Sequence, residues 1–489
     1  MGDIWLGVLP VAGMGAATCL LFLLSAVVRK GRAMGLLAST AVLLLGGGPV
    51  LLLWNEGGRT VQGALLSSDR MALFFDGIFV LVALFVILLS MDYISGKGGE
   101  KAEIHPLIAL SATGMMVLAS ATNLVTFYLG LETMSIAFYV LAGTLREHNR
   151  SVEAALKYFL LGAFSSAFLL FGMALLYGSG GSLDFGGLAI MFKAESYGLG
   201  ESFLVAGLLL FLVGLFFKLS LIPFHFWAPD VYQGSPTPIS ALMAVGGKTA
   251  AAAGAIRIFL SVFSVNALLS GKWLTLFILI GLITIFAGSM IALTQRKMKR
   301  LLAYSSIVHA GFLALGIGAL AVPAVRVAVL QALLFYLAAY LFMNVGAFAL
   351  AGVMERKENT DEDIASFSGL GTSAPFLAAL FALLMFSLAG IPLTVGFIGK
   401  FYLFKALIMG HLYRYAALGL IGAVIATFYY LKVTVALYFP AEGIDTAEKP
   451  KVGALTMAVL TVTAAATLYF GLFPGLINSV IAATGLTIG

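Results

Sequence analysis

Five ionisable side chains lie deep inside apolar stretches of this 489-residue chain. They are Lys157, Lys218, Lys248, Lys400 and Glu132. A charged residue at the centre of a bilayer costs about 2.5–3.5 kcal/mol on insertion scales, so such residues usually mark a route for ions or protons. All four basic members are lysines, whose pKa changes readily on burial, whereas arginine stays charged. We therefore predict that these groups exchange protons inside a membrane.

Glu132 shares one helical face with Tyr128, Ser135 and Tyr139, because these residues recur at helical spacing. A carboxylate close to Lys218 would favour the charged lysine, and its withdrawal would favour release of the proton. The alternative is structural: Glu132 and the lysines form ion pairs that only hold helices together. The two interpretations are compatible, and both remain open at the level of the sequence.

Three further basic residues, Arg257, Lys405 and Lys432, lie close to the ends of apolar stretches. Long basic side chains at such positions can bury their stems and place the charge at the membrane surface. We expect all three to snorkel in this way.

The histidines extend the polar set, because His225 follows Lys218 by seven residues and His309 follows the segment Tyr304-Ser-Ser. Each is either a proton relay or a satisfied interior residue. Only these two histidines lie at membrane depth, which argues against a bis-histidine haem site. The single cysteine, Cys19, excludes a disulfide framework, a zinc site built from cysteines and an iron–sulfur cluster held by this chain alone. We expect no metal and no cofactor on this chain.

The amino-acid composition indicates whether the chain folds in water or in a lipid bilayer. Hydrophobic residues make up 61% and charged residues 10% of the sequence, whereas soluble domains carry about 25% charged residues. Too little polar surface is left to cover a water-soluble globule, and the basic residues form no patch for nucleic acid. The chain is therefore expected to be a polytopic membrane protein in contact with the lipid bilayer.

Apolar segments of membrane-spanning length follow one another along the whole chain. A bilayer core of about 30 Å needs about 20 apolar residues in a helix, and by this measure the chain has about fourteen spans. No alternating pattern of the barrel type occurs, so the predicted fold is all-α. The predicted spans are 4–28, 34–54, 71–95, 106–121, 123–144, 153–178, 201–229, 236–261, 273–294, 299–320, 324–352, 374–408, 412–438 and 451–482.

Two of these spans are too long to be plain helices, because they would reach about 42 Å and about 50 Å at 1.5 Å per residue. The seventh contains Pro223, and the twelfth contains Gly390 and Pro392. Proline removes a backbone donor and clashes with the preceding turn, so both helices should break there. Broken helices at corresponding positions of two halves are typical of transporters with inverted repeats, although two unrelated kinks would look the same. Water is expected near Lys218 and Lys400, since unwound backbone at membrane depth lines a cavity or is covered by protein.

Basic residues concentrate in the loops on one side of the predicted membrane, among them Arg29, Lys30, Lys297, Lys299 and Arg300. The positive-inside rule places these loops on the cytoplasmic side of the cell inner membrane. Both termini are then predicted on the outer, periplasmic side.

Four segments together resemble the proton-translocating antiporter-like family of complex I and the Mrp antiporters. The most specific is FKLSLIPFHFWAPDVYQGSPTP at 217–238. It is supported by LGLE at 129–132, KRLLAYSS at 299–306 and AGIPLTVGFIGK at 389–400. Within the family, the chain is most similar to the N-type subunits of bacterial NADH–quinone oxidoreductases.

The resemblance implies about fourteen helices, with two inverted five-helix repeats and breaks in helices seven and twelve. It implies four parts: 1–105, the first repeat at 106–261, the second at 262–438 and a last helix at 439–489. Proton translocation is then expected to use Glu132, Lys218, Lys248 and Lys400, with a supporting polar axis that includes Lys157, His225 and His309. Lys405 matches no motif of the family.

The resemblance also implies that this chain is a non-redox subunit of an NADH:quinone oxidoreductase. NADH, FMN, iron–sulfur clusters and quinone are expected on partner subunits, which include a second antiporter-like subunit and a small K-type subunit. The alternatives are an Mrp-type cation/proton antiporter subunit, a homologous subunit of a membrane hydrogenase or of an F420- or ferredoxin-linked complex, and a passive scaffold.

Overall fold

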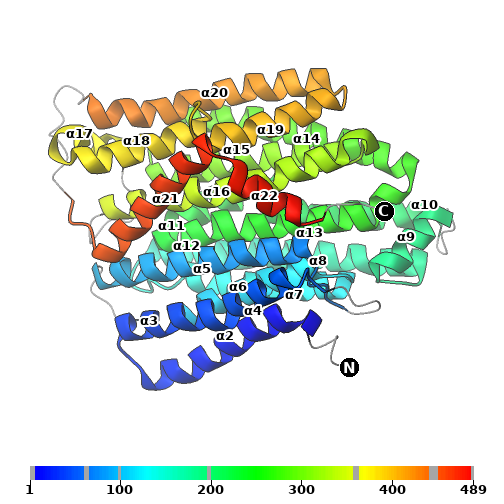
Figure 1. The fold of residues 1–489 in the computed structure, drawn as a ribbon, viewed down its shortest axis with the longest axis horizontal. Coiled ribbons are helices and arrows are strands. Elements are labelled where there is room, and N and C mark those ends of the chain that lie inside the picture. The colour runs from blue at the N-terminus through cyan, green and yellow to red at the C-terminus, as the bar shows by residue number, and fades with distance from the viewer. Residues whose placement is uncertain are drawn as a thin grey trace.

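A computed structural model describes residues 6–59, 65–96, 101–194, 200–355, 363–439 and 450–485. Within these ranges the chain is helical and contains no strand, only isolated bridges between loop residues. The helices lie side by side in one bundle (Figure 1). The predicted all-α membrane architecture is confirmed.

Twelve helical segments in the described ranges are long and apolar enough to cross a membrane. Each coincides with a predicted span, because an apolar run of this length is stable in lipid only when its backbone is fully hydrogen-bonded within the helix. They are α2 (Leu9–Val27), α3–η1–α4 (Gly31–Asn55), α5 (Arg70–Gly96), α7 (Leu124–Ala142), α8 (Asn149–Gly180), α10 (Glu201–Leu219), α12–η2–α13–η3 (Thr237–Val265), α14 (Ala267–Thr294), α15 (Met298–Ala319), η4–α16 (Pro323–Met354), α20 (Tyr413–Tyr438) and α21 (Ala454–Leu472).

The two remaining predicted spans correspond to shorter helices. The predicted span 106–121 is α6 (Ile104–Ser120), and 374–408 is divided into α18 (Pro375–Ala389) and α19 (Val395–Met409). Short helices η5 (Ile364–Phe367) and α17 (Leu370–Ser373) precede α18.

The first interruption separates α10 from the short helix α11 (Trp227–Gly234), and Pro223 lies within it. Ser220 has the left-handed φ of 59° and ends α10. The freed backbone groups find new partners, since Trp227 Nε1 donates to the Phe217 carbonyl at 2.9 Å and the Ile222 amide donates to Thr284 Oγ1 at 3.1 Å. Such replacement bonds are what allows irregular backbone at membrane depth.

The second interruption separates α18 from α19 and contains Gly390 and Pro392. Gly390 has φ 87°, a conformation that costs an ordinary residue about 1–2 kcal/mol. Ser387 Oγ accepts the Gly396 amide at 3.1 Å and so ties the start of α19 to the last turn of α18.

Two span predictions need correction, and one helix was not predicted. The helix of span 201–229 ends at Leu219, and its second part, α11, continues to Gly234. Span 451–482 is two helices, α21 and α22 (Gly475–Ala483), because the proline at 474 lacks the amide needed to continue α21. A further helix, α9 (Phe185–Ala194), lies between α8 and α10, where no element was predicted.

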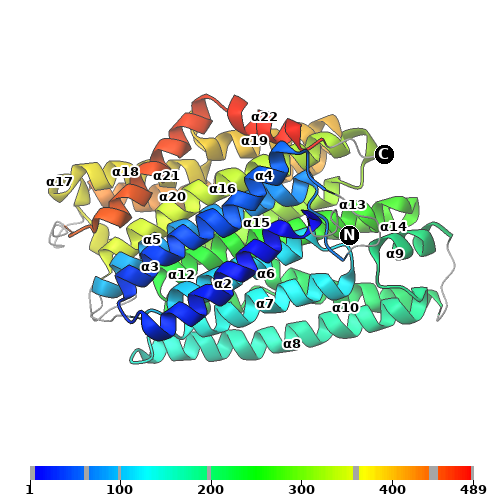
Figure 2. The same cartoon turned by 60° about the horizontal axis from the view of Figure 1, so that its bottom comes forward.

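Helices α15 and α16 and the segment Thr237–Val265 form the centre of the bundle and are buried along nearly their whole length. Helices α8, α20 and α2 lie at its periphery, where many of their apolar side chains are exposed (Figures 1 and 2). Helix α2 begins and α22 ends at the same end of the bundle, on the right in both views. The two ends of the described chain therefore lie at the same end of the bundle.

Candidate functional site

Glu132 lies in the middle of α7, which packs closely on α6. A Cβ atom at Gly130 would lie 2.6 Å from the Leu118 amide nitrogen of α6, so only glycine permits this approach. The start of α7 is capped by Asn123, whose side chain accepts the Val125 amide at 2.7 Å. Half-buried Glu132 accepts a hydrogen bond from Ser166 on α8. The glutamate therefore faces the α7–α8 contact.

Lys218 is buried in the last turn of α10, directly before the first interruption. Its ammonium donates to Ser135 Oγ at 2.7 Å and to Tyr139 Oη at 3.4 Å, both on α7. The same nitrogen lies 5.8 Å from the ring centroid of Tyr158, within the range of a cation–π contact. The predicted helical face of α7 does meet Lys218, through its hydroxyl groups.

Glu132 and Lys218 make no ion pair in the described part of the chain. Ser135, one turn further along α7 than Glu132, accepts the hydrogen bond from the lysine instead. The structure therefore shows the two charges apart. The predicted proton exchange requires this arrangement and also one in which the two charges are close together.

Lys248 begins α13 immediately after the π-helical segment η2 (Met243–Gly247). It is fully enclosed, and its Nζ has no hydrogen-bond partner among the described protein groups. The centroid of the Tyr232 ring lies 6.0 Å from Nζ. Buried polar groups are as a rule satisfied by protein or by ordered water, so hydration of Lys248 is expected.

Aromatic side chains fill the space between Lys218 and Lys248. Tyr158, which faces Lys218, stacks on Trp227 with the ring centroids 4.4 Å apart. Trp227 in turn lies 5.8 Å from Tyr232, the residue that faces Lys248. The first broken helix, through Trp227 on α11, therefore connects the surroundings of the two lysines.

Lys400 is buried on α19 and points at the second interruption. Its Nζ donates to the carbonyl oxygens of Leu388 and Ala389, each at 2.8 Å. These carbonyls belong to the last turn of α18, where helical acceptors have no intrahelical partner and the dipole is negative. A Cβ atom on Gly390 would lie 3.0 Å from Lys400 Cδ, so glycine leaves room for the lysine.

His309 on α15 is fully buried between tyrosines of other helices. Its Nδ1 lies 2.5 Å from Tyr336 Oη on α16, and its Nε2 lies 3.2 Å from Tyr430 Oη on α20. Two further hydroxyl contacts adjoin this histidine: Ser305 Oγ with Tyr430 Oη at 2.5 Å, and Tyr340 Oη donating to Ser306 Oγ at 2.9 Å. The sequence analysis identified His309 but missed the tyrosines, although Tyr336 and Tyr340 recur at the i, i+4 spacing of one helical face.

His225 lies inside the first interruption and is buried. Its ring lies 4.6 Å from that of Phe226 and 6.5 Å from that of Tyr304, and its Nδ1 has no partner among the described protein groups. The structure places it next to the break and does not connect it by a hydrogen bond to any of the lysines in the described residues.

The prediction that Lys157 is buried is wrong. Its side chain is 43% exposed, in the third turn of α8, and forms ion pairs with Glu153 at 2.7 Å and Asp230 at 2.9 Å. Asp230 on α11 also binds Arg300 on α15 at 2.7 Å. The apolar sequence around Lys157 belongs to a helix longer than the bilayer is thick, so the lysine lies near its end rather than at its centre.

The prediction that Arg257 snorkels is also wrong, because its side chain is only 8% exposed. Its Nη1 and Nη2 atoms donate to the two carboxylate oxygens of Asp69 at 2.6 and 2.9 Å. Burial by itself raises the pKa of Asp69, but the charge and hydrogen bonds of Arg257 outweigh this and hold that pKa below its usual value. Lys405 and Lys432 are exposed as expected, and Lys432 donates to the Gln295 carbonyl at the end of α14.

The structure contains a buried ion pair that was not predicted from the sequence. Lys299, counted as a loop residue, lies 3.3 Å from Glu355, and both side chains are only 2% exposed. Glu355 also accepts hydrogen bonds from Tyr93 and Thr237, while Lys299 donates to the Ser235 carbonyl at 2.7 Å. Both charges border polar loops in the sequence, so hydropathy gave no sign of their burial.

The described residues contain no group of three His, Cys, Asp or Glu side chains arranged to hold a metal ion. Their chemistry is that of ammonium, imidazole and phenol groups in a low-dielectric interior, beside two breaks in the helical backbone. Lys218, Lys248 and Lys400 have neutral partners or none, and no carboxylate within ion-pairing distance in the described chain. Groups of this kind can accept and pass protons.

Comparison with known proteins identifies the family. A family model described as NADH:quinone oxidoreductase/Mrp antiporter, TM, matches residues 121–426. The chain is 40% identical over 415 residues to NADH-quinone oxidoreductase subunit N 1 of Solibacter usitatus, covering 84% of this chain and 83% of that protein. It is 37% identical over 510 residues to the subunit N of Thermobifida fusca, covering 97% and 90% of the two chains.

Solved structures show the same fold. A chain of respiratory complex I from Thermus thermophilus aligns with a TM-score of 0.81 at 31% identity, covering 97% of this chain and 99% of that one. A chain of the Mrp complex from Dietzia sp. DQ12-45-1b aligns with a TM-score of 0.84 over 100% and 98% of the two chains, but its 19% identity shows the fold alone. The chain therefore belongs to the NADH:quinone oxidoreductase/Mrp antiporter transmembrane family, and within it to the subunit N group of NADH-quinone oxidoreductases.

Proposed function

We propose that this chain moves protons across the membrane as a subunit of an NADH–quinone oxidoreductase. The observation that carries the proposal is the set of three enclosed ammonium groups, Lys218, Lys248 and Lys400, none of them held by a carboxylate in the described chain. A purely structural role would require these charges to be neutralised in ion pairs, because an unpaired buried charge is costly. Proton exchange gives such groups a reason to be present.

Timing in this proposal comes from the distance between Glu132 and Lys218. Glu132 is bound by Ser166 and Lys218 by Ser135, so a small shift of α7 against α10 would bring the charges together or part them. Moving one charge against 100 mV takes about 2.3 kcal/mol, and one pKa unit corresponds to about 1.4 kcal/mol. A change of about two units in lysine pKa therefore meets the demand.

The proposed route continues from Lys218 through the surroundings of Tyr232 and Lys248 to His309 and Lys400. His225 is proposed to support it beside the first break, and Pro223, Gly390 and Pro392 keep the breaks open. Lys157 has a different proposed role, since its ion pair with Asp230 holds α11 in place from outside the axis. Protons are taken up on the cytoplasmic side and released outside, with both termini on the outer face of the inner membrane.

Redox chemistry belongs to other subunits in this proposal. NADH, FMN, iron–sulfur clusters and quinone are bound by partners, and their energy reaches this chain through contacts with a second antiporter-like subunit and a small K-type subunit. The chain itself is proposed to consist of two inverted repeats, 106–261 and 262–438, flanked by 1–105 and 439–489. The interruption after α10 in the first and after α18 in the second supports this division.

The test uses the assembled complex in inverted membrane vesicles. Lys218→Met and Lys400→Met each remove one proposed carrier, and Lys405→Met is the matched control because Lys405 is an exposed lysine on the same helix as Lys400. We expect both carrier variants to assemble and to lose proton translocation per NADH oxidised, while the control pumps like the wild type. Full pumping by assembled Lys218→Met and Lys400→Met complexes would establish the scaffold instead.

An Mrp-type antiporter subunit is the second candidate, because the matching family model is described as covering both NADH:quinone oxidoreductases and Mrp antiporters. Gentle extraction separates the two. Co-purification with flavin and iron–sulfur subunits supports the proposed function, and co-purification with antiporter subunits alone would contradict it.

A further inference from the structure

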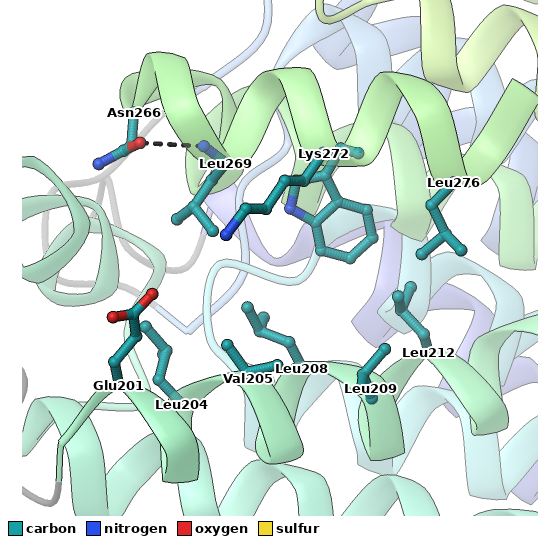
Figure 3. A pocket seen from close by; sticks show the side chains of 11 residues that line it. Glu201, Leu204, Val205, Leu208, Leu209, Leu212, Asn266, Leu269, Lys272 and Leu276 are labelled. Atoms are coloured by element: carbon teal, nitrogen blue, oxygen red, sulfur yellow. Dashed lines mark hydrogen bonds between the residues drawn. The ribbon is translucent and has the colours of Figure 1, made fainter.

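An apolar groove runs between α10 and α14, on a side of the bundle that the proton-exchange proposal does not use (Figure 3). It encloses about 420 Å³, a volume typical of sites for small ligands. Its lining is Glu201, Leu204, Val205, Leu208, Leu209 and Leu212 of α10 with Asn266, Leu269, Lys272, Trp273 and Leu276 of the α14 side.

The groove has a buried floor and an open rim. Leu208 and Trp273 are buried, whereas Val205 and Leu209 are 39% and 53% exposed. The two walls run in the same direction, with the starts of both helices at one end in Figure 3. An apolar slot that opens sideways from a membrane helix bundle faces lipid chains.

Its length matches one leaflet of a bilayer. The α10 wall extends from residue 201 to residue 212, and eleven steps of about 1.5 Å give about 16 Å. Half of a hydrocarbon core of about 30 Å is about 15 Å. The groove thus accommodates an acyl chain from the headgroup level to the middle of the membrane.

Two opposite charges stand at the end where both helices begin. Figure 3 shows the Glu201 carboxylate pointing from α10 toward α14, and the Lys272 ammonium pointing from α14 toward α10. Both side chains are exposed, and no ion pair joins them in the described chain. A cation and a carboxylate that face one opening without binding each other are complementary to a ligand that carries both charges.

We propose that this groove binds one acyl chain of a zwitterionic aminophospholipid of the phosphatidylethanolamine type. The lipid phosphate contacts Lys272, its ammonium contacts Glu201, and the chain lies on Leu208 and Trp273. Lysine is a usual phosphate ligand. Phosphatidylglycerol lacks the ammonium group that Glu201 would bind, and an isoprenoid quinone uses neither charge. The proposal does not depend on proton translocation.

The first experiment maps where a lipid probe reacts. The purified complex is reconstituted with phosphatidylethanolamine that carries a photoreactive diazirine in one acyl chain, or with phosphatidylglycerol that carries the same chain, and labelled peptides are identified by mass spectrometry. We expect labelling of the α10 and α14 peptides that line the groove, at least about threefold stronger with the ethanolamine probe, as a surface charge contact allows. Equal labelling by both probes, or labelling only outside the groove, would overturn the proposal.

Variants distinguish the groove from general lipid contact. Val205→Trp and Leu209→Trp fill the opening at exposed positions that tolerate a larger side chain, and Leu279→Trp on the exposed face of α14 outside the groove is the matched control. Both groove variants should lose labelling while the control keeps it. Unchanged labelling of the groove peptides in both would show bulk lipid contact only.

The charges are tested separately with Lys272→Gln and Glu201→Gln, against Lys193→Gln at an exposed position of α9. Lys272→Gln and Glu201→Gln should each reduce the preference for the ethanolamine probe, and the control Lys193→Gln should not. A preference that survives the loss of both charges would contradict headgroup recognition. Cross-links between the groove and peptides of another subunit, found in place of lipid labelling, would show that a protein occupies the groove. This result would contradict the proposed lipid.

Discussion

Each buried lysine meets a different neutral environment. Lys218 donates to hydroxyl groups, Lys400 to backbone carbonyls, and Lys248 lies over an aromatic ring. Hydroxyl groups can both accept and donate hydrogen bonds, carbonyl groups only accept, and an aromatic face attracts only the cation. The three lysines are therefore not interchangeable members of one row.

Lys248→Arg tests whether loss of the proton matters at this position. Arginine keeps a positive charge but does not release its proton in proteins, so we expect both Lys248→Arg and Lys248→Met to lower proton translocation in assembled complexes. Vesicle acidification coupled to NADH oxidation measures this, with Lys405→Arg as the control. Normal pumping by Lys248→Arg would show that charge alone is required.

Asp69→Asn tests the buried pair at Arg257. The change leaves the guanidinium without its carboxylate, and breaking a buried pair costs about 3–5 kcal/mol; we expect a loss toward the lower end because Asp69 is 27% exposed. The thermal midpoint of the purified complex measures the loss, with Asp363→Asn at a more exposed pair as control.

The same pair gives a pH dependence. The pKa of Asp69 is lowered in the folded chain, so its stabilisation is fully present above the pKa of the unfolded carboxyl group and disappears as pH falls through the folded value. The difference in thermal midpoint between wild type and Asp69→Asn should therefore be constant near neutral pH and shrink in acid. A difference that grows in acid would contradict this assignment.

At the scale of elements, the two interruptions share one device. Each follows a helix that ends in a left-handed residue, Ser220 or Gly390, and each has a lysine in contact with its surroundings. The prolines made both breaks predictable from sequence, because a missing amide and a steric clash are local properties. The partners of the freed backbone groups, Thr284 and Ser387, were not predictable, since Thr284 comes from another helix and Ser387 from the preceding one.

Gly390→Ala tests the second interruption. The left-handed φ costs alanine about 1–2 kcal/mol, and its Cβ would press on Lys400 Cδ at 3.0 Å. We expect weaker proton translocation with assembly retained. Gly77→Ala in α5, where an added Cβ meets nothing within 4 Å, is the control and should be neutral. Wild-type pumping by Gly390→Ala would show that the position of Lys400 tolerates displacement.

At the scale of the whole molecule, buried polar contacts tie α15 and the end of α16 to the segment that follows the first break. Lys299 on α15 binds the Ser235 carbonyl, and Glu355 at the end of α16 binds Thr237 at the start of α12. The adjacent Arg300 binds Asp230 on α11. Residues of α15 and of the end of α16 therefore hold the segment that follows the first break.

A double-mutant cycle on Lys299→Met and Glu355→Gln measures this connection. Each single change leaves an uncompensated buried group and should lower the thermal midpoint strongly, by the equivalent of about 3–5 kcal/mol, whereas the double change should cost less than the sum. The cycle Lys297→Met with Asp363→Asn, a more exposed pair, should be nearly additive. Additive losses at Lys299 and Glu355 would mean that the two residues act independently.

The sequence by itself determined the helical membrane class, most of the spans and the two broken helices. A membrane span requires a long apolar segment whose backbone is hydrogen-bonded within the helix, and proline breaks a helix locally. Both the spans and the breaks can therefore be predicted from the order of residues alone. Hydropathy also located Lys218, Lys248 and Lys400 at depth.

Only the tertiary structure decided which charges are buried and what they meet. It exposed Lys157, enclosed Arg257 and Lys299, brought tyrosines from α16 and α20 to His309, and left Glu132 apart from Lys218. The physical reason is that burial and hydrogen-bond partners depend on which helices pack together, and residues far apart in the chain supply those contacts. A one-dimensional apolar pattern carries no such information.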